Sequence, residues 1–181
     1  MKSFYFFISV NVLTLMSCVS HKSIVSQEDI DALDSLVKNQ RFQIHSDWLY
    51  PQASIALQQV LNSGILQGGN NANSISLIGN PNFIRISGDS ISSYLPYYGE
   101  RRMQVDYGGR DSTIEFEGLV KNYKVEKNKD HSYTISFEAK SKMEGFKVFI
   151  ELTPTLKSDV TISGNSRSSI NYIGNVKPLD E

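Results

Sequence analysis

Tyrosines and arginines gather in two short segments of this sequence, where together they could form a binding surface. Tyrosine offers a flat apolar face with a polar tip, and arginine offers a planar fork of donors that fits carboxylate or phosphate. Around one opening, such side chains could hold a sugar, a lipid headgroup or the end of a peptide. The candidate binding residues are Tyr94, Tyr97, Tyr98, Arg101, Arg102, Tyr107, Arg167 and Tyr172.

The same residues also have a purely structural explanation. In this alternative the segment from Leu95 to Tyr98 plugs the core and turns the chain, and Arg101 bonds to free backbone carbonyls. Motifs built from proline, glycine and aromatic residues more often fix a turn than bind a ligand. The composition therefore favours packing for this motif, with binding as the alternative.

Catalytic and metal-binding patterns are missing from the sequence. The three histidines, His21, His45 and His131, are far apart, whereas a zinc site needs several convergent ligands. No Gly-x-Ser-x-Gly nucleophile motif is present. Glu115 and Glu117 share the outward face of one predicted strand, where solvated charges are expected. We therefore predict no enzyme activity, no metal and no other cofactor.

The first residues have the pattern of an export signal. A basic start, Met1-Lys2-Ser3, precedes an apolar run that ends near Met16 and is too short to span a bilayer. The segment Leu15-Met16-Ser17-Cys18 resembles the lipobox of bacterial lipoprotein signals. We expect a signal peptide over residues 1–17, a lipidated tether over 18–26 and one β-rich domain over 27–181; an ordinary signal peptide with an accidental cysteine is the alternative.

Composition supports the lipoprotein interpretation. Cys18 is the only cysteine among 181 residues, and a thioether-linked lipid on its sulfur, with fatty-acyl chains such as palmitate, would account for it. We therefore expect the membrane to be one partner, through this lipid, at the periplasmic face of the outer membrane or alternatively at the cell surface. Eighteen basic and nineteen acidic residues, without charge runs, argue against nucleic acid as a partner.

Two helices are predicted near the N-terminus, one on each side of a first strand. Ser26 can cap a helix over about residues 27–40, in which Ile30, Leu33 and Leu36 recur at helical spacing. A first strand with Phe42, Ile44, Trp48 and Tyr50 on one face ends at Pro51. A second helix follows and is expected to stop at Gly64.

From Ile75 onward the apolar residues alternate with polar ones, which is typical of half-buried strands. The apolar phase changes after Gly118, as a β-bulge would produce. Short strands with one polar face and hairpin-length connections favour an antiparallel sheet. We predict a mainly β fold: a strongly curved antiparallel sheet or partly closed barrel of about eight strands, with one or two N-terminal helices packed on it. A two-sheet sandwich is the alternative.

One motif resembles a known family. Tyr94-Leu95-Pro96-Tyr97-Tyr98-Gly99 is similar to the signature of the domain-of-unknown-function 4251 family, whose usual form is Tyr-Leu-Pro-Tyr-aromatic-Gly followed by arginine. The flanking segments 86–91 and 114–116 resemble the family's neighbouring strands, and 167–174 resembles its closing Arg-x-x-Ile-x-Tyr-x-Gly. Here Glu100 separates Gly99 from Arg101. The resemblance implies a small exported or lipid-anchored protein of Bacteroidetes-type bacteria, and it implies no activity.

Three functions are compatible with these observations. The first is a non-catalytic, lipid-anchored envelope module that binds a small or extended ligand, or a partner protein, near Tyr97 to Arg102. The second is an envelope assembly or chaperone factor whose sheet edge captures strands of other exported proteins. The third is a hydrolase with carboxylates that spacing does not reveal.

Overall fold

A computed structural model describes residues 25–52, 54–65, 70–101, 113–141 and 144–179 of the chain. Its first element is helix α2, Gln27–Asn39, which begins at Ser26 with a capping box: the Ser26 hydroxyl accepts from the Asp29 amide, and the Asp29 carboxylate accepts from the Ser26 amide. The helix buries Ile30, Leu33, Leu36 and Val37. It ends at Gln40 in the left-handed conformation, so the predicted first helix is confirmed.

Strand β1, Arg41–Pro51, changes face in its middle. The pairing register shifts between Ser46 and Trp48, which leaves Asp47 as a bulge. Phe42 and Ile44 are buried as predicted, but beyond the bulge Leu49 is buried and Tyr50 is exposed. The expected single face through Trp48 and Tyr50 is therefore wrong, because one extra residue reverses the alternation.

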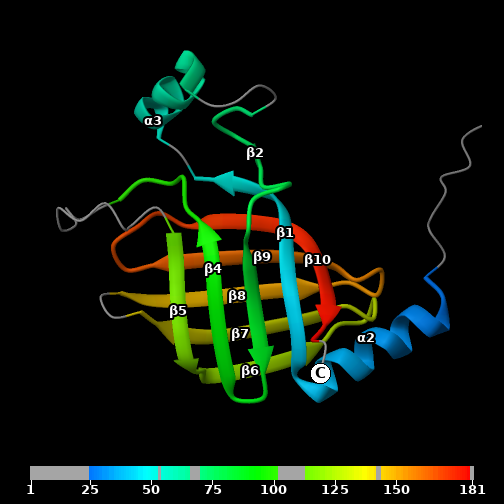
Figure 1. Ribbon diagram of the computed structural model, residues 1–181. Coiled ribbons are helices and arrows are strands. Elements are labelled where there is room, and N and C mark those ends of the chain that lie inside the picture. Colours follow the sequence, from blue (N-terminus) through cyan, green and yellow to red (C-terminus); the bar gives the residue numbers. More distant parts are fainter. Residues whose placement is uncertain (1–24, 53, 66–69, 102–112, 142–143, 180–181) are drawn as a thin grey trace, which may run out of the picture.

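The second helical segment consists of α3, Ile55–Val60, and the π-helical turn η2, Leu61–Ile65. Gly64 adopts a φ of 88° in that turn, which is the left-handed conformation expected at this position. Figure 1 shows this segment standing off one end of the sheet, and Ile55 is 77% exposed. Strand β2, Ile75–Ser76, then pairs with β1.

Eight further strands build the rest of the sheet. They are β3 Phe83–Ser87, β4 Ser90–Pro96, β5 Thr113–Leu119, β6 Lys121–Lys127, β7 Tyr133–Lys140, β8 Gly145–Leu152, β9 Lys157–Gly164 and β10 Ile170–Pro178. All pairings between these strands are antiparallel, in the order β5-β4-β3-β1-β10-β9-β8-β7-β6 with β2 added to β1. The strand group β5-β4-β3 crosses in front of the group β10 to β6 in Figure 1, so the sheet folds over one interior.

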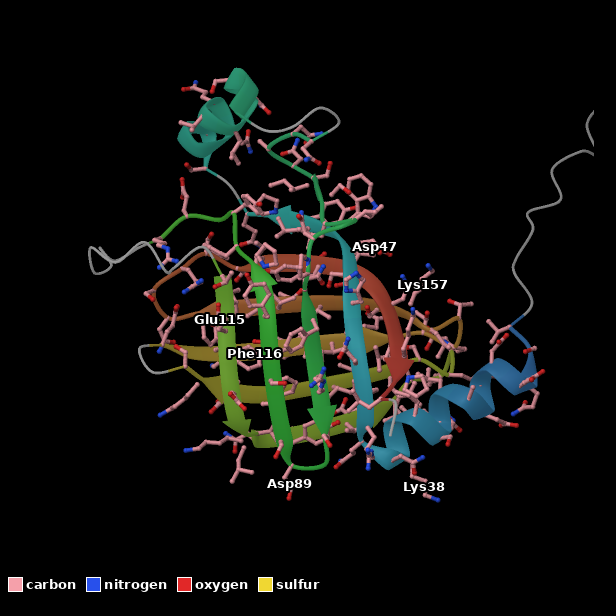
Figure 2. All side chains as sticks on the ribbon, in the orientation of Figure 1. Lys38, Asp47, Asp89, Glu115, Phe116 and Lys157 are labelled. Carbon is pink, nitrogen blue, oxygen red and sulfur yellow. The ribbon has the colours of Figure 1, made fainter. Side chains whose placement is uncertain are left out.

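Alternate side chains of each strand enter that interior. On β5, Glu115 points out and Phe116 points into the space between the two layers (Figure 2), and Phe116 is 3% exposed. The inward positions of β3, β4 and β7 to β10 belong to a single buried hydrophobic cluster. The prediction of one nearly closed antiparallel sheet is thus confirmed, with ten strands among the described residues where about eight were expected.

One of the additional strands arises where the sequence suggested a bulge. Gly118 has a φ of 145° and Asn122 a φ of 54°, so the chain turns a corner between β5 and β6. The bulge itself lies slightly later, where the β6–β7 register shifts between Lys121 and Lys124. As a result β5 and β6 are the two edges of the sheet, although only Val120 separates them in the chain.

Candidate functional site

Tyr97 of the predicted binding motif lies inside the molecule. It follows the end of β4 and is 6% exposed. Its hydroxyl lies 2.7 Å from the Glu100 carbonyl oxygen and 3.0 Å from the Ser168 hydroxyl. Burial raises the pKa of Tyr97 above its ordinary value. Gly99 completes the turn, because a Cβ there would lie 2.5 Å from the Tyr97 hydroxyl.

Arg167, in the loop between β9 and β10, forms a buried ion pair with Glu144. Its Nε donates to the Glu144 carboxylate at 2.8 Å, and both side chains are less than a tenth exposed. Its Nη1 donates to the Thr113 carbonyl at 3.2 Å, at the start of β5. The guanidinium also stacks on Tyr97, 4.8 Å from the ring centroid. Arg167 therefore connects the loop between β9 and β10 to the segment before β8, the start of β5 and the residue that follows β4.

Tyr172 of β10 is fully buried beside them. Its hydroxyl donates to the Pro96 carbonyl at 2.8 Å, and burial raises its pKa well above the ordinary value. We call Tyr97, Glu144, Arg167, Ser168 and Tyr172 the aromatic-arginine cluster. Its hydrogen bonds join the turn after β4, the loop before β8 and the loop between β9 and β10. Tyr97, Arg167 and Tyr172 are therefore packed inside the molecule.

The other predicted binding residues are more accessible. Tyr94 and Tyr98 are 39% and 38% exposed, and Tyr94 lies on the outer face of β4 opposite Glu115. Arg101 is half-buried, with its guanidinium 6.0 Å from the Tyr97 ring centroid, and it pairs with Arg167 in an isolated bridge. Cys18, Arg102 and Tyr107 lie outside the described residues.

Arg101 also borders an open polar hollow between α3 and the cluster. The hollow has a volume of about 570 Å³. Ser54 donates a hydrogen bond to Glu100 across its rim. Its lining residues are Pro51, Gln52, Ser54, Gln58, Glu100, Arg101 and Ser168.

A second cavity lies between the end of β5 and the adjoining ends of β7 and β8, with Lys121 at the start of β6 beside it. We call it the seam cleft; it has a volume of about 460 Å³, within the range of roughly 300–1,000 Å³ typical of small-molecule sites. Phe116 and Phe146 lie at its base with ring centroids 5.6 Å apart, beside the buried Ile91 and Ala139. Gly118 and Gly145 border it without side chains.

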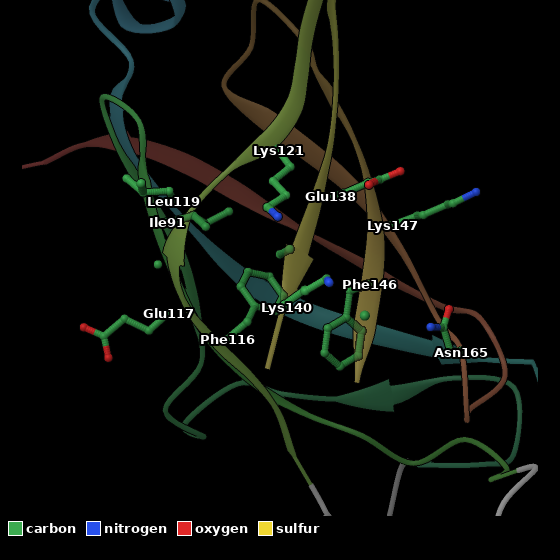
Figure 3. Close-up of a pocket in the computed structure, with 13 residues that line it drawn as sticks. Ile91, Phe116, Glu117, Leu119, Lys121, Glu138, Lys140, Phe146, Lys147 and Asn165 are labelled. Carbon is green, nitrogen blue, oxygen red and sulfur yellow. The ribbon is translucent and has the colours of Figure 1, made fainter. Parts of the chain in front are cut away.

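Charged side chains surround the mouth of the seam cleft. They are Glu117, Lys121, Glu138, Lys140 and Lys147. Figure 3 shows Lys121 and Lys140 with their amino groups between the walls, whereas Glu117, Glu138 and Lys147 point away. The cleft thus combines an aromatic base with two cationic groups at its opening.

Sequence reasoning missed the seam cleft. Phe116 and Phe146 were predicted to face inward, and the interruption at Gly118 was recognised, but nothing local indicates that the chain on either side of Gly118 forms two edges that do not pair. Within the described residues, no three His, Cys, Asp or Glu side chains meet as metal ligands. No described helix has the length and apolar character needed to cross a membrane.

Comparisons with known proteins agree with this fold. The model of a family described as a domain of unknown function, DUF4251, matches residues 25–176. The chain is also similar to the crystal structure of a DUF4251 family protein from Bacteroides eggerthii, with 16% identity and a TM-score of 0.55 over 83% of this chain and 88% of that one. A comparison with curated proteins gives no match.

Proposed function

This chain belongs to the DUF4251 family, and from that premise we propose that it is a lipid-anchored envelope protein whose β-domain binds a small ligand in the seam cleft without catalysis. The observation that carries the proposal is an open cleft between the end of β5 and the adjoining ends of β7 and β8, with the largely buried rings of Phe116 and Phe146 among its lining residues. Apolar surface in a concave site is a main source of affinity for small ligands.

The seam cleft is better suited to a ligand than the aromatic-arginine cluster is. In the cluster, Arg167 and Tyr97 already use their polar groups on Glu144, Ser168 and backbone carbonyls. A ligand would have to replace these bonds. The half-buried Arg101, which lines the polar hollow, and the exposed Tyr98 near it in the chain are the second candidate binding position.

Binding of an uncharged fluorescent probe, N-phenyl-1-naphthylamine, tests the proposal. The full chain with Cys18→Ser is used, so that no acyl chain can be attached at that position. We expect the probe to bind, and Ala139→Phe to remove most of the binding, because Ala139 lines the cleft and a larger side chain would fill it.

The controls separate the cleft from the other surfaces. Lys129→Phe places an equal ring on the exposed β6–β7 turn and should leave probe binding unchanged, and circular dichroism checks the fold of each variant. Equal binding by Ala139→Phe and the parent would refute the cleft as the site. Loss of binding in Tyr98→Ala and Arg101→Ala instead would assign it to the polar hollow.

The second function, capture of an extended segment, is supported by one observation. In the described sheet, β5 and β6 each have a strand on one side only, so an added strand could pair with either edge. Hydrogen exchange would then show new protection of the amides of β5, Thr113–Leu119, or of β6, Lys121–Lys127, in the presence of an unfolded exported protein. Unchanged exchange there would exclude this function.

The hydrolase alternative receives less support. Glu144 is the one buried carboxylate among the described residues, and its partner is Arg167. Acid–base catalysis by two carboxyls needs a second such group in the same cleft.

A further inference from the structure

The charges at the seam cleft identify a class of ligand. Resting on the proposed function, we propose that the cleft binds a single-chain fatty acid, with its tail on Phe116 and Phe146 and its carboxylate at Lys121 and Lys140. Three steps lead to this assignment: the size of the cleft, the chemistry of its base and the charge at its mouth.

Size limits the ligand to one chain. The volume of about 460 Å³ is in the lower part of the small-molecule range of roughly 300–1,000 Å³. The cleft lies between the end of β5 and the adjoining ends of β7 and β8, where Gly118 and Gly145 leave the walls without side chains. An extended chain can enter such a gap, whereas a two-chain lipid is too large for it.

The base of the cleft suits an apolar tail. Phe116 and Phe146 are each 3% exposed, and their rings are tilted by 43° to one another. Arg167 stacks on the Phe146 ring at 5.5 Å, which holds this wall in place from inside. Burial of a tail's methylene groups removes apolar surface from water, so a chain that enters the cleft gains affinity without any polar contact.

The mouth of the cleft selects the headgroup. Lys121 and Lys140 extend between the walls, while Glu117 and Glu138 point away from it (Figure 3). None of Lys121, Lys140 and Lys147 forms an ion pair with a described residue. Three lysines against two carboxylates leave one net positive charge at the rim, which matches a monoanion such as a carboxylate better than a dianionic phosphate.

Competition against N-phenyl-1-naphthylamine tests the headgroup. The competitors are dodecanoate, dodecanol, dodecyltrimethylammonium and dodecyl phosphate, all below their micelle concentrations, with the full chain carrying Cys18→Ser. We expect dodecanoate to bind about tenfold more tightly than dodecanol, since its charge adds two charge-assisted hydrogen bonds. The cationic competitor should be the weakest, because it would face Lys121 and Lys140.

Lysine variants locate the effect. Lys121→Gln with Lys140→Gln should reduce dodecanoate affinity to that of dodecanol and leave dodecanol affinity unchanged. Lys124→Gln with Lys129→Gln removes the same charge from exposed positions outside the cleft and should change neither. All four lysines are exposed, so these variants should fold.

The outcomes distinguish this proposal from the one on which it rests. If the uncharged probe binds in the cleft but dodecanoate is no better than dodecanol, or the Lys121 and Lys140 variant keeps full dodecanoate affinity, the fatty-acid proposal is wrong and the binding module stands. Tighter binding of dodecyl phosphate than of dodecanoate would overturn the carboxylate assignment. Failure of every probe and competitor to bind would reject both proposals.

Discussion

At the residue scale, the buried ion pair between Arg167 and Glu144 joins the loop between β9 and β10 to the segment before β8. Glu144 also accepts a hydrogen bond from the Ser166 amide at 2.9 Å, and it lies over Gly164, where a Cβ would be 2.3 Å from its carboxylate. The missing side chain at Gly164 therefore leaves room for the Glu144 carboxylate. Arg167 was predicted as a candidate ligand contact, whereas Glu144 was not predicted to have any role.

Substitution of Glu144 by glutamine should lower the free energy of unfolding by about 3–5 kcal/mol, because it leaves the Arg167 charge buried without its counter-ion. Urea unfolding measures the change, with the exposed Glu151→Gln as the matched control. The double variant Glu144→Gln with Arg167→Met should lose less than the two single changes together. A loss no larger than that of Glu151→Gln would show that the pair contributes little.

Tyr123 on β6 behaves differently, because its buried hydroxyl has no hydrogen-bond partner among the described residues. Its ring stacks on Phe137 at 6.2 Å, and burial raises its pKa to about 12. Tyr123→Phe keeps the ring, so stability at neutral pH should be unchanged or higher by up to about 1 kcal/mol.

The pH dependence of Tyr123→Phe follows from the raised pKa. The folded state favours the neutral phenol, so its contribution is complete below the ordinary value of 10.0 and is lost as the pH rises through about 12. The variant should therefore gain stability relative to the parent across that interval, and its absorbance titration should lack one tyrosine that ionises near 12. A parent that is clearly more stable than the variant at pH 7 would reveal an unrecognised partner.

At the scale of elements, the pairing of β1 with β10 requires a glycine. A Cβ at Gly174 would lie 2.0 Å from the His45 carbonyl oxygen and 2.5 Å from the Ser46 Cα, both backbone atoms beside the Asp47 bulge. Gly174→Ala should therefore destabilise the domain by more than about 4 kcal/mol, and the melting temperature and soluble yield should fall.

Gly145→Ala is the matched comparison, since its Cβ would lie 3.4 Å from the flexible Asn165 amide. This variant should melt close to the parent. Equal melting temperatures for Gly174→Ala and Gly145→Ala would mean that the β1 bulge can move away from β10.

Helix α2 is attached to the far end of the sheet through Asp34. Its carboxylate accepts from Lys127 at the end of β6 at 2.6 Å and from the Tyr133 hydroxyl at the start of β7 at 2.9 Å. The hydrogen bond from Lys127 lowers the pKa of Asp34 below 3.8, and the bond to Asp34 raises the pKa of Lys127 above 10.5.

Asp34→Asn should lower the melting temperature at neutral pH, because α2 loses an ionic contact with β6. A lowered carboxyl pKa stabilises the fold above the ordinary value and ceases to do so as the pH falls through the folded value. A raised lysine pKa stabilises it below the ordinary value and ceases to do so at higher pH. The difference in melting temperature between parent and variant should thus be greatest between these two pKa values and should shrink as the pH falls through the lowered pKa of Asp34. A difference that is constant with pH would assign it to packing alone.

At the scale of the whole molecule, the proposed anchor is the feature that relates the domain to its surroundings. Labelled palmitate should enter the full chain during expression in a Bacteroidetes host, and Cys18→Ser should abolish the label, since Cys18 is the only cysteine. The parent should sediment with membranes and the variant should not. Label that persists in Cys18→Ser would exclude this attachment.

The general architecture follows from sequence because burial is encoded locally. Alternation at Ile135 and Phe137 places each strand's inner face, and Ser26 with Asp29 defines the start of α2, so both were predicted correctly. Two details were not predicted. A single residue, Asp47, reverses the face of β1, and the turn at Gly118 divides one expected strand into two.

The sequence by itself determined the inner face of most strands, where the first helix starts and that the sheet is antiparallel, because each depends on spacing along a short stretch of chain. Only the tertiary structure decided that β5 and β6 do not pair with each other, that the rings of Phe116 and Phe146 are in contact at the seam cleft and that Arg167 forms an ion pair with Glu144. The Phe116–Phe146 and Arg167–Glu144 contacts each join residues more than twenty positions apart in the chain. They form only when the whole sheet curls far enough to bring its distant strands together.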